Sequence, residues 1–454
     1  MPEVVDALIP LNRSEHGYAA IDGLAGTMIQ PYLLRFNVPI AVAEMRQALR
    51  ELLSACPRLR GVLDPGLHLY RLRILPDDTV VDQLFDVAFR VEAHLDADDP
   101  AQMESYHGQM LNEPMPLERG LGARWRFVPH PTQPVLFFGV HHMLLDGKSI
   151  YQLLGDLIKR LNGHPIPQQP LEPLSMLGSI APHHWWQWPV QVWRSRRHKV
   201  AEARRLAALH IQQVPTRVAS NFSSNAIRHH VVPLGTADMR QAARKLGVSL
   251  NTFLISALSQ SFLDLAPSDP QAAAVIRISV DLRKYYPAKE GRGPLLGNHV
   301  GAFLVIEQGS AKSVADRVRS VDAQIKAGQE RYARREMCWT YLFDELLPLA
   351  GRTLIGHVAR QLQRKDRFPR ISCHATSVGD ASALNPPDAT IRLVQIIPAV
   401  PSISLLPVVA ELDGRLYIPM SWQRAHTTVD EVDAYLSRLD ATIARLVDEA
   451  KAAT

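Results

Sequence analysis

The segment His141-His142-Met143-Leu144-Leu145-Asp146-Gly147 is the most informative stretch of this chain. It directly follows the apolar run at 135–140, Val-Leu-Phe-Phe-Gly-Val, which is typical of a fully buried strand. The end of such a strand holds a reactive side chain in a fixed position. Because neighbouring side chains on extended backbone point in opposite directions, only one of the two histidines faces a given cavity.

The residue types in this segment suit proton transfer. A histidine with the ordinary pKa of roughly 6.5 is partly neutral at cellular pH and accepts a proton. Asp146 follows the second histidine, and we expect Gly147 to give the backbone the freedom for the turn into the next helix. The sequence therefore predicts a catalytic site at the end of this strand.

The composition is that of an ordinary folded protein. The 454 residues allow two large domains or three ordinary ones. Apolar residues make up 46% and charged residues 21%, which excludes a disordered chain, a collagen-like chain and an all-membrane protein. Cys56, Cys338 and Cys373 form no CxxC pair, so a disulfide framework and a structural zinc site are excluded, and we expect buried thiols in a reducing compartment.

Two stretches bear on localisation. Near the N-terminus, Glu3 and Asp6 stand where a signal peptide carries basic residues. The longest uncharged stretch, 393–410, is interrupted by three prolines, which favours two short buried strands or turns over a membrane-spanning helix. We therefore expect a cytoplasmic protein.

Helical and strand patterns alternate along the chain, with no internal repeat. The patterns predict helices over 41–55, 149–161, 192–212, 236–246 and 252–263, further helices that begin at Ser313 and at the capping box Thr428–Glu431, a half-buried strand at 124–128, and strands at 135–140 and 229–233. Such alternation predicts an α/β fold.

The segment at 141–147 matches the pattern HHxxxDG, and with it the chain resembles the CoA-dependent acyltransferase superfamily. That superfamily includes condensation domains of nonribosomal peptide synthetases, polyketide-associated acyltransferases, wax ester synthases and alcohol acetyltransferases. Further segments match its markers in family order: Cys56-Pro57-Arg58-Leu59-Arg60 (HPxLR), Pro116-Leu117 (PLR, with Glu118 in place of the usual Arg), Gly247–Phe253 (GVTVNDV), Val280-Asp281-Leu282-Arg283 followed by Gly297-Asn298 (VDLR…GN), and Thr376-Ser377-Val378-Gly379 (SNVG). The chain has no DFGWG segment, which argues against the plant BAHD branch.

The resemblance implies a fold and a reaction class. The expected fold is α/β, with two chloramphenicol-acetyltransferase-like lobes that form a pseudo-dimer and an active-site tunnel between them. We expect the lobes at 1–195 and 226–454, joined by a basic linker or helix at 196–225. The expected reaction moves an acyl group from an acyl-CoA or an acyl carrier protein to a small-molecule hydroxyl or amine. No bound cofactor, metal or nucleic acid is expected.

The resemblance also implies roles in the HHxxxDG segment. His142 is expected to act as the general base that takes the acceptor's proton, while His141 and Gly147 shape the turn. Donors in the tunnel are expected to hold the oxyanion that forms on the thioester carbonyl.

Residues outside that segment are expected to support the site. Asp146 is expected to be structural and to pair with an arginine of the other half, for which Arg283 is the candidate. Asn298 and Ser377 are candidates for lining the tunnel.

One basic segment matches no marker of the superfamily. Between Arg194 and Arg205 there are six basic residues and one acid, so this block alone carries as much net charge as the whole chain, +5. Four of the seven tryptophans precede it or lie beside it, at positions 185, 186, 188 and 193. A local block of this kind predicts an anionic partner, with Arg194, Arg196 and Arg197 as candidate donor-binding residues for CoA phosphates or an acidic carrier protein. Peripheral contact with a lipid surface and a merely solvated helix face are the alternatives.

The histidines of this segment have other interpretations. An isolated histidine pair is more often a packed turn, and His141, His142 and Asp146 lack the spacing of a metal site. The spacing of His141 and Asp146 also fits the H-x₄-D motif of glycerophospholipid acyltransferases, whose further motifs and hydrophobic anchors are missing.

The alternative function for the whole chain is that of a catalytically silent condensation-like module that docks a carrier protein or a lipid.

Overall fold

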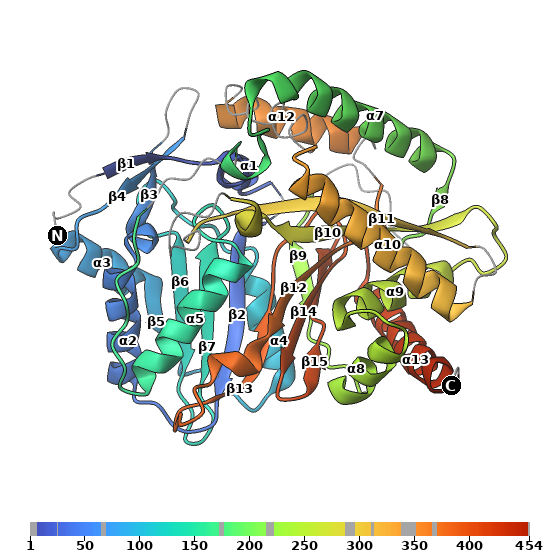
Figure 1. The fold of residues 1–454 in the computed structure, drawn as a ribbon. Helices are drawn as coiled ribbons and strands as arrows, with labels where there is room; N and C mark the ends of the chain where they lie inside the picture. Colours follow the sequence, from blue (N-terminus) through green and yellow to red (C-terminus); the bar gives the residue numbers. More distant parts are fainter. Residues whose placement is uncertain are drawn as a thin grey trace.

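Two main β-sheets, each with its own hydrophobic core, organise the protein (Figure 1). The structure is a computed structural model that describes residues 7–24, 26–64, 70–171, 177–214, 222–286, 296–309, 313–336, 351–365 and 370–452. Cys338, which the sequence suggests is a buried thiol, lies outside these residues, whereas Cys56 and Cys373 are buried free thiols.

The first sheet has five strands in the order β13-β2-β7-β6-β5. Its members are β2 (Ile29–Phe36), β5 (Phe89–Val91), β6 (Ala123–Val128), β7 (Val135–His141) and β13 (Leu393–Pro398). The central strand β7 pairs antiparallel with both β2 and β6, and all its residues are buried. The predicted buried strand at 135–140 is therefore confirmed.

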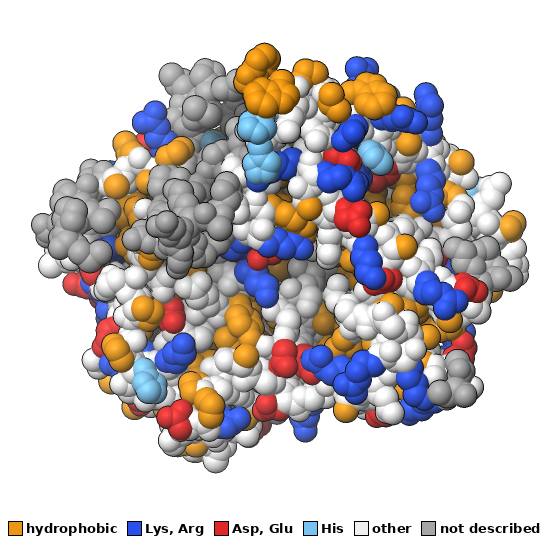
Figure 2. All heavy atoms as spheres, in the orientation of Figure 1, with side chains coloured by type: hydrophobic (Ala, Val, Ile, Leu, Met, Phe, Trp, Pro, Cys, Tyr) orange, Lys and Arg blue, Asp and Glu red, His pale blue; other side chains and the backbone are white. Residues whose placement is uncertain are grey.

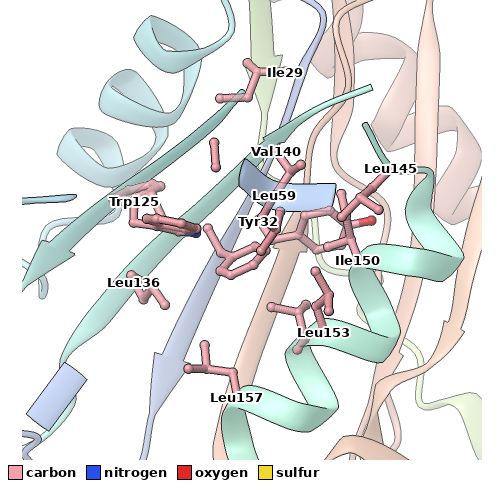
Figure 3. Packing of buried hydrophobic residues seen from close by; sticks show 14 of the residues in the cluster. Ile29, Tyr32, Leu59, Trp125, Leu136, Val140, Leu145, Ile150, Leu153 and Leu157 are labelled. Atoms are coloured by element: carbon pink, nitrogen blue, oxygen red, sulfur yellow. The ribbon is translucent and has the colours of Figure 1, made fainter. Parts of the chain in front are cut away.

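Helices α2 (Val42–Ala55) and α5 (Gly147–Leu161) contact each other and share the core of the first sheet. Figure 3 shows Leu153 and Leu157 of α5 pointing toward strand residues such as Leu136. Burial of each such aliphatic side chain contributes about 1.5–3 kcal/mol. Both helices were predicted from the spacing of their apolar residues, and α5 fixes the direction in which the chain leaves β7.

A small sheet and three more helices complete the first half. The sheet has the order β1-β4-β3. The elements are β1 (Ala7–Pro10), α1 (Arg13–Ile21), β3 (Gly61–Asp64), β4 (Arg71–Ile74), α3 (Thr79–Ala88) and α4 (Pro100–Met110). Asn12 caps α1 in a capping box with Glu15.

The second sheet has the order β11-β10-β12-β14-β16-β9, with β15 beside β14 and β8 beside β10. Its strands are β8 (His210–Ile211), β9 (Asn225–Arg228), β10 (Ala272–Asp281), β11 (Val300–Gln308), β12 (Cys373–Asp380), β14 (Leu406–Leu412), β15 (Arg415–Tyr417) and β16 (Met420–Gln423). Helices α8 (Thr236–Lys245), α9 (Leu250–Leu263), α10 (Val314–Ala333) and α13 (Val429–Ala452) contribute to its core. The predicted caps are present: Ser313 caps α10, and Thr428 and Glu431 bond each other reciprocally at the start of α13.

Strand β13 connects the two halves of the chain. It belongs to the second half by sequence but pairs antiparallel with β2 of the first sheet. Leu393 and Ile396 are buried in the core of that sheet. The first sheet therefore contains one strand from the predicted second lobe, 226–454, because β13 forms its edge beside β2.

The strand at 124–128 differs from its prediction. Alternation suggested a half-buried strand, but all residues of β6 are buried. Arg124 donates to the carbonyl oxygens of Glu113 and Pro114, and Arg126 donates to that of Ala88. The two arginines are buried because backbone carbonyls satisfy their guanidinium groups.

Two boundaries in the middle of the chain also differ. The basic helix α7 spans Trp188–Ala207 and not 192–212, because the chain then leaves to form β8 beside β10. The strand predicted at 229–233 begins and ends earlier, as β9, and in 229–233 only Val231 forms an isolated bridge, with Tyr417. Helix α7 and helix α12 (Gly351–Arg364) run across the top of Figure 1, and α12 contacts α1.

Within the described residues, no single helix is both long enough and apolar enough to cross a membrane. Helices α8 and α9 meet these criteria only when they are taken together, and they are bent by 93° relative to each other.

Candidate active site

The HHxxxDG segment forms the turn between β7 and α5. The amide of His142 donates to the carbonyl of Met28 (2.7 Å), and the amide of Leu144 donates to that of His141 (2.9 Å). Asp146 is the N-cap of α5 and accepts from the amide of Ser149 (2.9 Å). The segment is thus fixed at both ends, by the sheet and by a helix cap.

Gly147 serves this turn for a reason other than the predicted one. It does not adopt a positive φ. A Cβ atom at this position would lie 3.3 Å from the hydroxyl oxygen of Tyr32 and 3.8 Å from Val378. The glycine therefore leaves room for the close approach of Tyr32, and the expectation of special backbone freedom was wrong.

His141 is fully buried and serves as an anchor. Its Nδ1 accepts from the amide of Met143 (3.0 Å), so in the neutral ring Nε2 carries the hydrogen. Nε2 then donates to Asp22 Oδ1 (3.1 Å). Both ring nitrogens are used by the protein itself, which leaves neither free for a substrate.

His142 has a different environment. Its side chain lies parallel to the ring of Tyr18, with centroids 3.8 Å apart and an interplanar angle of 11°. The Nδ2 atom of Asn298 lies 2.8 Å from Nδ1 and also donates to the His142 carbonyl (2.8 Å). No side chain of the described residues forms a hydrogen bond with Nε2, so it is the ring nitrogen that the neighbouring side chains leave unused.

The environment of His142 also sets its charge. Burial lowers the pKa of His142 to about 4, and the nearby carboxylate of Asp146 offsets only part of this effect. The imidazole is therefore neutral at pH 7 and has a lone pair with which to accept a proton.

The predicted ion pair between the halves is present. Arg283 NH1 lies 2.7 Å from Asp146 Oδ2, and NH2 lies 3.0 Å from Oδ1, so the contact is bidentate. Burial opposes ionisation of Asp146, but the charge and hydrogen bonds of Arg283 outweigh it and lower the pKa to about 2. The amide of His299 adds a further hydrogen bond to Oδ2 (2.8 Å).

The carbonyl oxygen of Gly297 accepts three hydrogen bonds within the site. It accepts from the amide of Asp146 (3.1 Å), from the hydroxyl of Ser149 (2.8 Å) and from Arg283 NH2 (3.0 Å). The marker segment Gly297-Asn298 thus holds both the cap of α5 and the ring of His142.

A second buried ion pair supports the turn from the first half. Arg58, from the Cys56–Arg60 marker, pairs with Glu15 of α1 and donates through Nε to the Leu144 carbonyl (2.7 Å). Glu15 also accepts from the amide of Asn298 (3.2 Å). Two sequence markers far apart in the chain therefore converge on one network.

The remaining predicted residues lie elsewhere. Ser377 is exposed on β12, and its hydroxyl accepts from the amide of Gly379 (3.2 Å), so its role in lining a tunnel stays a prediction. Arg194, Arg196 and Arg197 are exposed on α7. Their role in donor binding also stays a prediction.

Sequence reasoning missed Tyr18 and Glu15, which contact the centre of the site. They lie on α1, whose sequence Arg-Ser-Glu-His-Gly-Tyr-Ala-Ala-Ile has only a weak amphipathic pattern. The one available signal was the capping box of Asn12 and Glu15, and it indicates a helix start rather than a site.

The described residues contain no group of three or more histidine, cysteine, aspartate or glutamate side chains that could hold a metal ion. His141 and Asp146 both have other partners inside the protein.

Comparisons with known proteins identify the fold. No protein-family model and no curated protein sequence matches the chain. Among solved structures, the first condensation domain of the calcium-dependent antibiotic synthetase is similar at 14% identity and a TM-score of 0.70, over 97% of this chain and 96% of that one. Trichothecene 15-O-acetyltransferase TRI3 from Fusarium sporotrichioides is similar at 13% identity and a TM-score of 0.65, over 98% and 99%.

Polyketide synthase associated protein 5 from Mycobacterium tuberculosis is also similar, at 16% identity and a TM-score of 0.63, over 97% of this chain and 98% of that one. The chain therefore has the two-lobed fold shared by condensation domains and CoA-dependent acyltransferases. At these identities the likeness is one of fold.

Proposed function

We propose that the protein is an acyltransferase that moves an acyl group from a thioester to a hydroxyl or amine, with His142 as general base. The observation that carries the proposal is the environment of His142: a neutral, buried imidazole at a strand end, held from both halves and with no side chain bonded to Nε2. The thioester is an acyl-CoA or an acyl carrier protein. Because two similar structures are an acetyltransferase and a condensation domain, acyl transfer is the reaction class the fold favours.

In the proposed reaction, the acceptor donates its proton to Nε2 while its oxygen or nitrogen attacks the thioester carbonyl. A tetrahedral oxyanion forms, collapses to the ester or amide, and expels the thiolate. The imidazolium returns its proton to the thiolate, so the products are the acylated acceptor and a free thiol. A positioned base of this kind contributes on the order of 10²–10⁴-fold to the rate.

The positive charge that forms transiently on His142 is stabilised from two sides. The face of Tyr18 lies against the ring, where its π-electrons favour a cation. The carboxylate of Asp146 acts on the ring through its charge. Because Asp146 is locked to Arg283, it does not itself take the proton.

Asn298 fixes the backbone beside the ring of His142. Its Nδ2 donates to the His142 carbonyl (2.8 Å), and its backbone amide donates to Glu15 of the first half. For Nε2 to accept a proton from the acceptor, Nδ1 must carry the hydrogen. We expect Asn298→Leu, which removes the bond to the His142 carbonyl, to lower activity.

The experiment is a panel of acyl-CoA and acyl carrier protein donors with alcohol and amine acceptors. Free thiol is detected continuously, and the acylated product is identified by mass spectrometry. The proposal predicts thiol release coupled one-to-one to product. Binding of a carrier protein without thiol release from any donor would instead support the rival, a silent docking module.

A further inference from the structure

Helix α7 packs on the rest of the protein along one face. Ser195 is buried, and Gln191, four residues earlier, donates to the backbone carbonyl of Arg334 (3.1 Å). Glu202 follows Ser195 by seven residues, so it lies on the same packed face of the helix. The one acid of the basic block is therefore turned away from the opposite face.

The opposite face of α7 carries an exposed stripe of apolar and basic side chains. Its members recur every three or four residues, which places them on one side of the helix: Val190, Trp193, Arg197, Val200 and Arg204. The guanidinium carbon of Arg197 lies 5.4 Å from the centroid of the Trp193 ring, in a cation–π contact. The stripe thus combines apolar and cationic groups and contains no acid.

Two more tryptophans precede this stripe. Trp185 is 80% exposed and Trp186 is 58% exposed, and their ring centroids are 6.1 Å apart. On α12, which lies at the same end of the molecule in Figure 1, Leu354 and Val358 are exposed one turn apart. Figure 2 shows hydrophobic rings and basic side chains together at this end. An exposed hydrophobic patch of this kind marks an interaction surface.

We propose that Trp185, Trp186 and the exposed stripe of α7, together called the α7 surface, bind an anionic lipid bilayer. Tryptophan is enriched at the level of lipid headgroups, and Lys and Arg are attracted to anionic headgroups. A helix that presents both residue types lies in the plane of the membrane interface. Charge alone would also attract an acidic carrier protein, but the exposed tryptophans favour the lipid surface.

The test measures binding of the full chain to lipid vesicles without donor or acceptor, so its outcome does not depend on acyl transfer. Co-sedimentation at low and high salt compares vesicles of phosphatidylcholine alone with vesicles of equimolar phosphatidylcholine and phosphatidylglycerol. The aromatic variant replaces Trp185, Trp186 and Trp193 with alanine, and the charge variant combines Lys199→Glu with Arg204→Glu. Both variants keep the three arginines predicted to bind the donor.

Matched controls lie elsewhere on the surface. Val80, Val87 and Val429 are exposed on α3 and α13, and their replacement with alanine also reduces three exposed apolar side chains. Arg90→Glu combined with Arg119→Glu changes the net charge as much as the charge variant does. Circular dichroism checks that each variant is folded.

We expect the wild-type protein to bind the anionic vesicles at least about tenfold more tightly than the neutral ones, because each basic residue near an anionic bilayer increases affinity about fivefold. The aromatic variant and the charge variant should each bind the anionic vesicles at least about tenfold more weakly. Both control variants should keep wild-type affinity. High salt should weaken binding, because it screens the attraction between the charges.

Three results would overturn the proposal: no binding to anionic vesicles, equal binding to neutral vesicles, or equal losses in the α7 variants and their controls. A carrier protein that loses affinity for the same α7 variants, while the wild type binds no vesicles, would assign the surface to a protein partner instead. Each of these results leaves acyl transfer untouched, because thiol release is measured without vesicles.

Discussion

Charged side chains have opposite environments in two regions of the molecule: the contact between the two halves around His142, and the surface of α7. Around His142 the charged groups are buried and paired, as in Asp146 with Arg283 and Glu15 with Arg58. On α7 the charges of the basic block face solvent, and Trp185 beside them is 80% exposed. Figure 2 shows exposed hydrophobic and basic side chains together at the top of the molecule, where α7 lies.

This difference indicates that the charges around His142 act mainly on stability and that those of α7 act mainly on binding. A buried charge that loses its partner destabilises the fold, because it cannot regain its hydration. An exposed charge is screened by salt beyond about 8 Å and contributes little to stability, so it acts mainly on binding. Substitutions at the two regions should therefore move different measurements.

The largest expected effect is on stability, at the pair between the halves. Asp146→Ala or Arg283→Ala alone should lower the free energy of unfolding by about 3–5 kcal/mol. Arg283→Ala strands the buried carboxylate of Asp146, and Asp146→Ala leaves Arg283 with the partly exposed Asp281 as its remaining carboxylate partner. The double variant should cost much less than the sum of the two single changes. Urea denaturation of the four proteins measures this cycle, and strict additivity would refute a coupled pair.

An exposed ion pair provides the matched control for that cycle. Arg319 lies 2.8 Å from Asp316 on α10, with side chains that are 66% and 57% exposed. Its cycle should give a coupling of only about 0–1 kcal/mol. Equal coupling energies at the two pairs would remove the contrast between buried and exposed charge.

The next effect concerns pH. Burial lowers the pKa of His142 to about 4 and that of His299 to about 3, whereas the unfolded chain titrates near 6.5. Below about pH 6.5 the unfolded state therefore binds protons that the folded state does not, and stability falls as the pH decreases toward 4. Each such histidine contributes a slope of up to about 1.4 kcal/mol per pH unit.

Urea denaturation at pH 7, 6 and 5 checks this sign. His299→Gln should reduce the slope, because one titrating group is gone. A free energy of unfolding that stays constant or rises between pH 7 and 5 would contradict the expected burial of neutral histidines at the contact between the halves.

The smallest expected effect on stability is at α7. Replacing Arg194, Arg196 and Arg197 with glutamate should leave the free energy of unfolding nearly unchanged, but should raise KM for the natural donor with kcat nearly constant, which marks lost uniform binding. The effect should shrink at high salt, and it should be larger with a carrier protein than with the matching acyl-CoA if a carrier is the true donor.

A charge-matched control lies elsewhere on the surface. Arg71, Arg73 and Arg119 are exposed in the first half, and their replacement with glutamate changes the net charge equally. If this variant raises KM as much as the α7 variant, or if neither does, α7 is not the donor site. Liposome co-sedimentation would then test membrane contact, with loss of binding expected on replacement of Trp185, Trp186 and Trp188 by alanine.

The sequence predicted those parts of the structure that local patterns determine. The strand before His141, the helix α5 and the caps of α10 and α13 depend on periodicity and capping within a few residues. The pairing of Asp146 with Arg283 came from the family resemblance and is present.

The features that the sequence did not predict have a common physical reason. Each depends on contacts between segments that are far apart in the chain. β6 is fully buried because carbonyls of other segments satisfy its arginines. The late strand β13 joins the first sheet, and Tyr18 reaches His142 from the N-terminal helix. Such contacts leave no periodic signal in a single sequence. The sequence markers therefore identified His142 as a site residue, but they did not predict which distant residues surround it.

The two adjacent histidines have separate tasks in the proposed function: His142 accepts the proton and His141 holds the turn. The most direct measurement is thiol release with saturating donor and acceptor for wild type, His142→Ala and His141→Ala, with the free energy of unfolding determined for each. We expect His142→Ala to lower kcat by at least about two decades with little change in stability, and His141→Ala chiefly to lower stability. Equal kcat for wild type and folded His142→Ala would contradict this division of tasks.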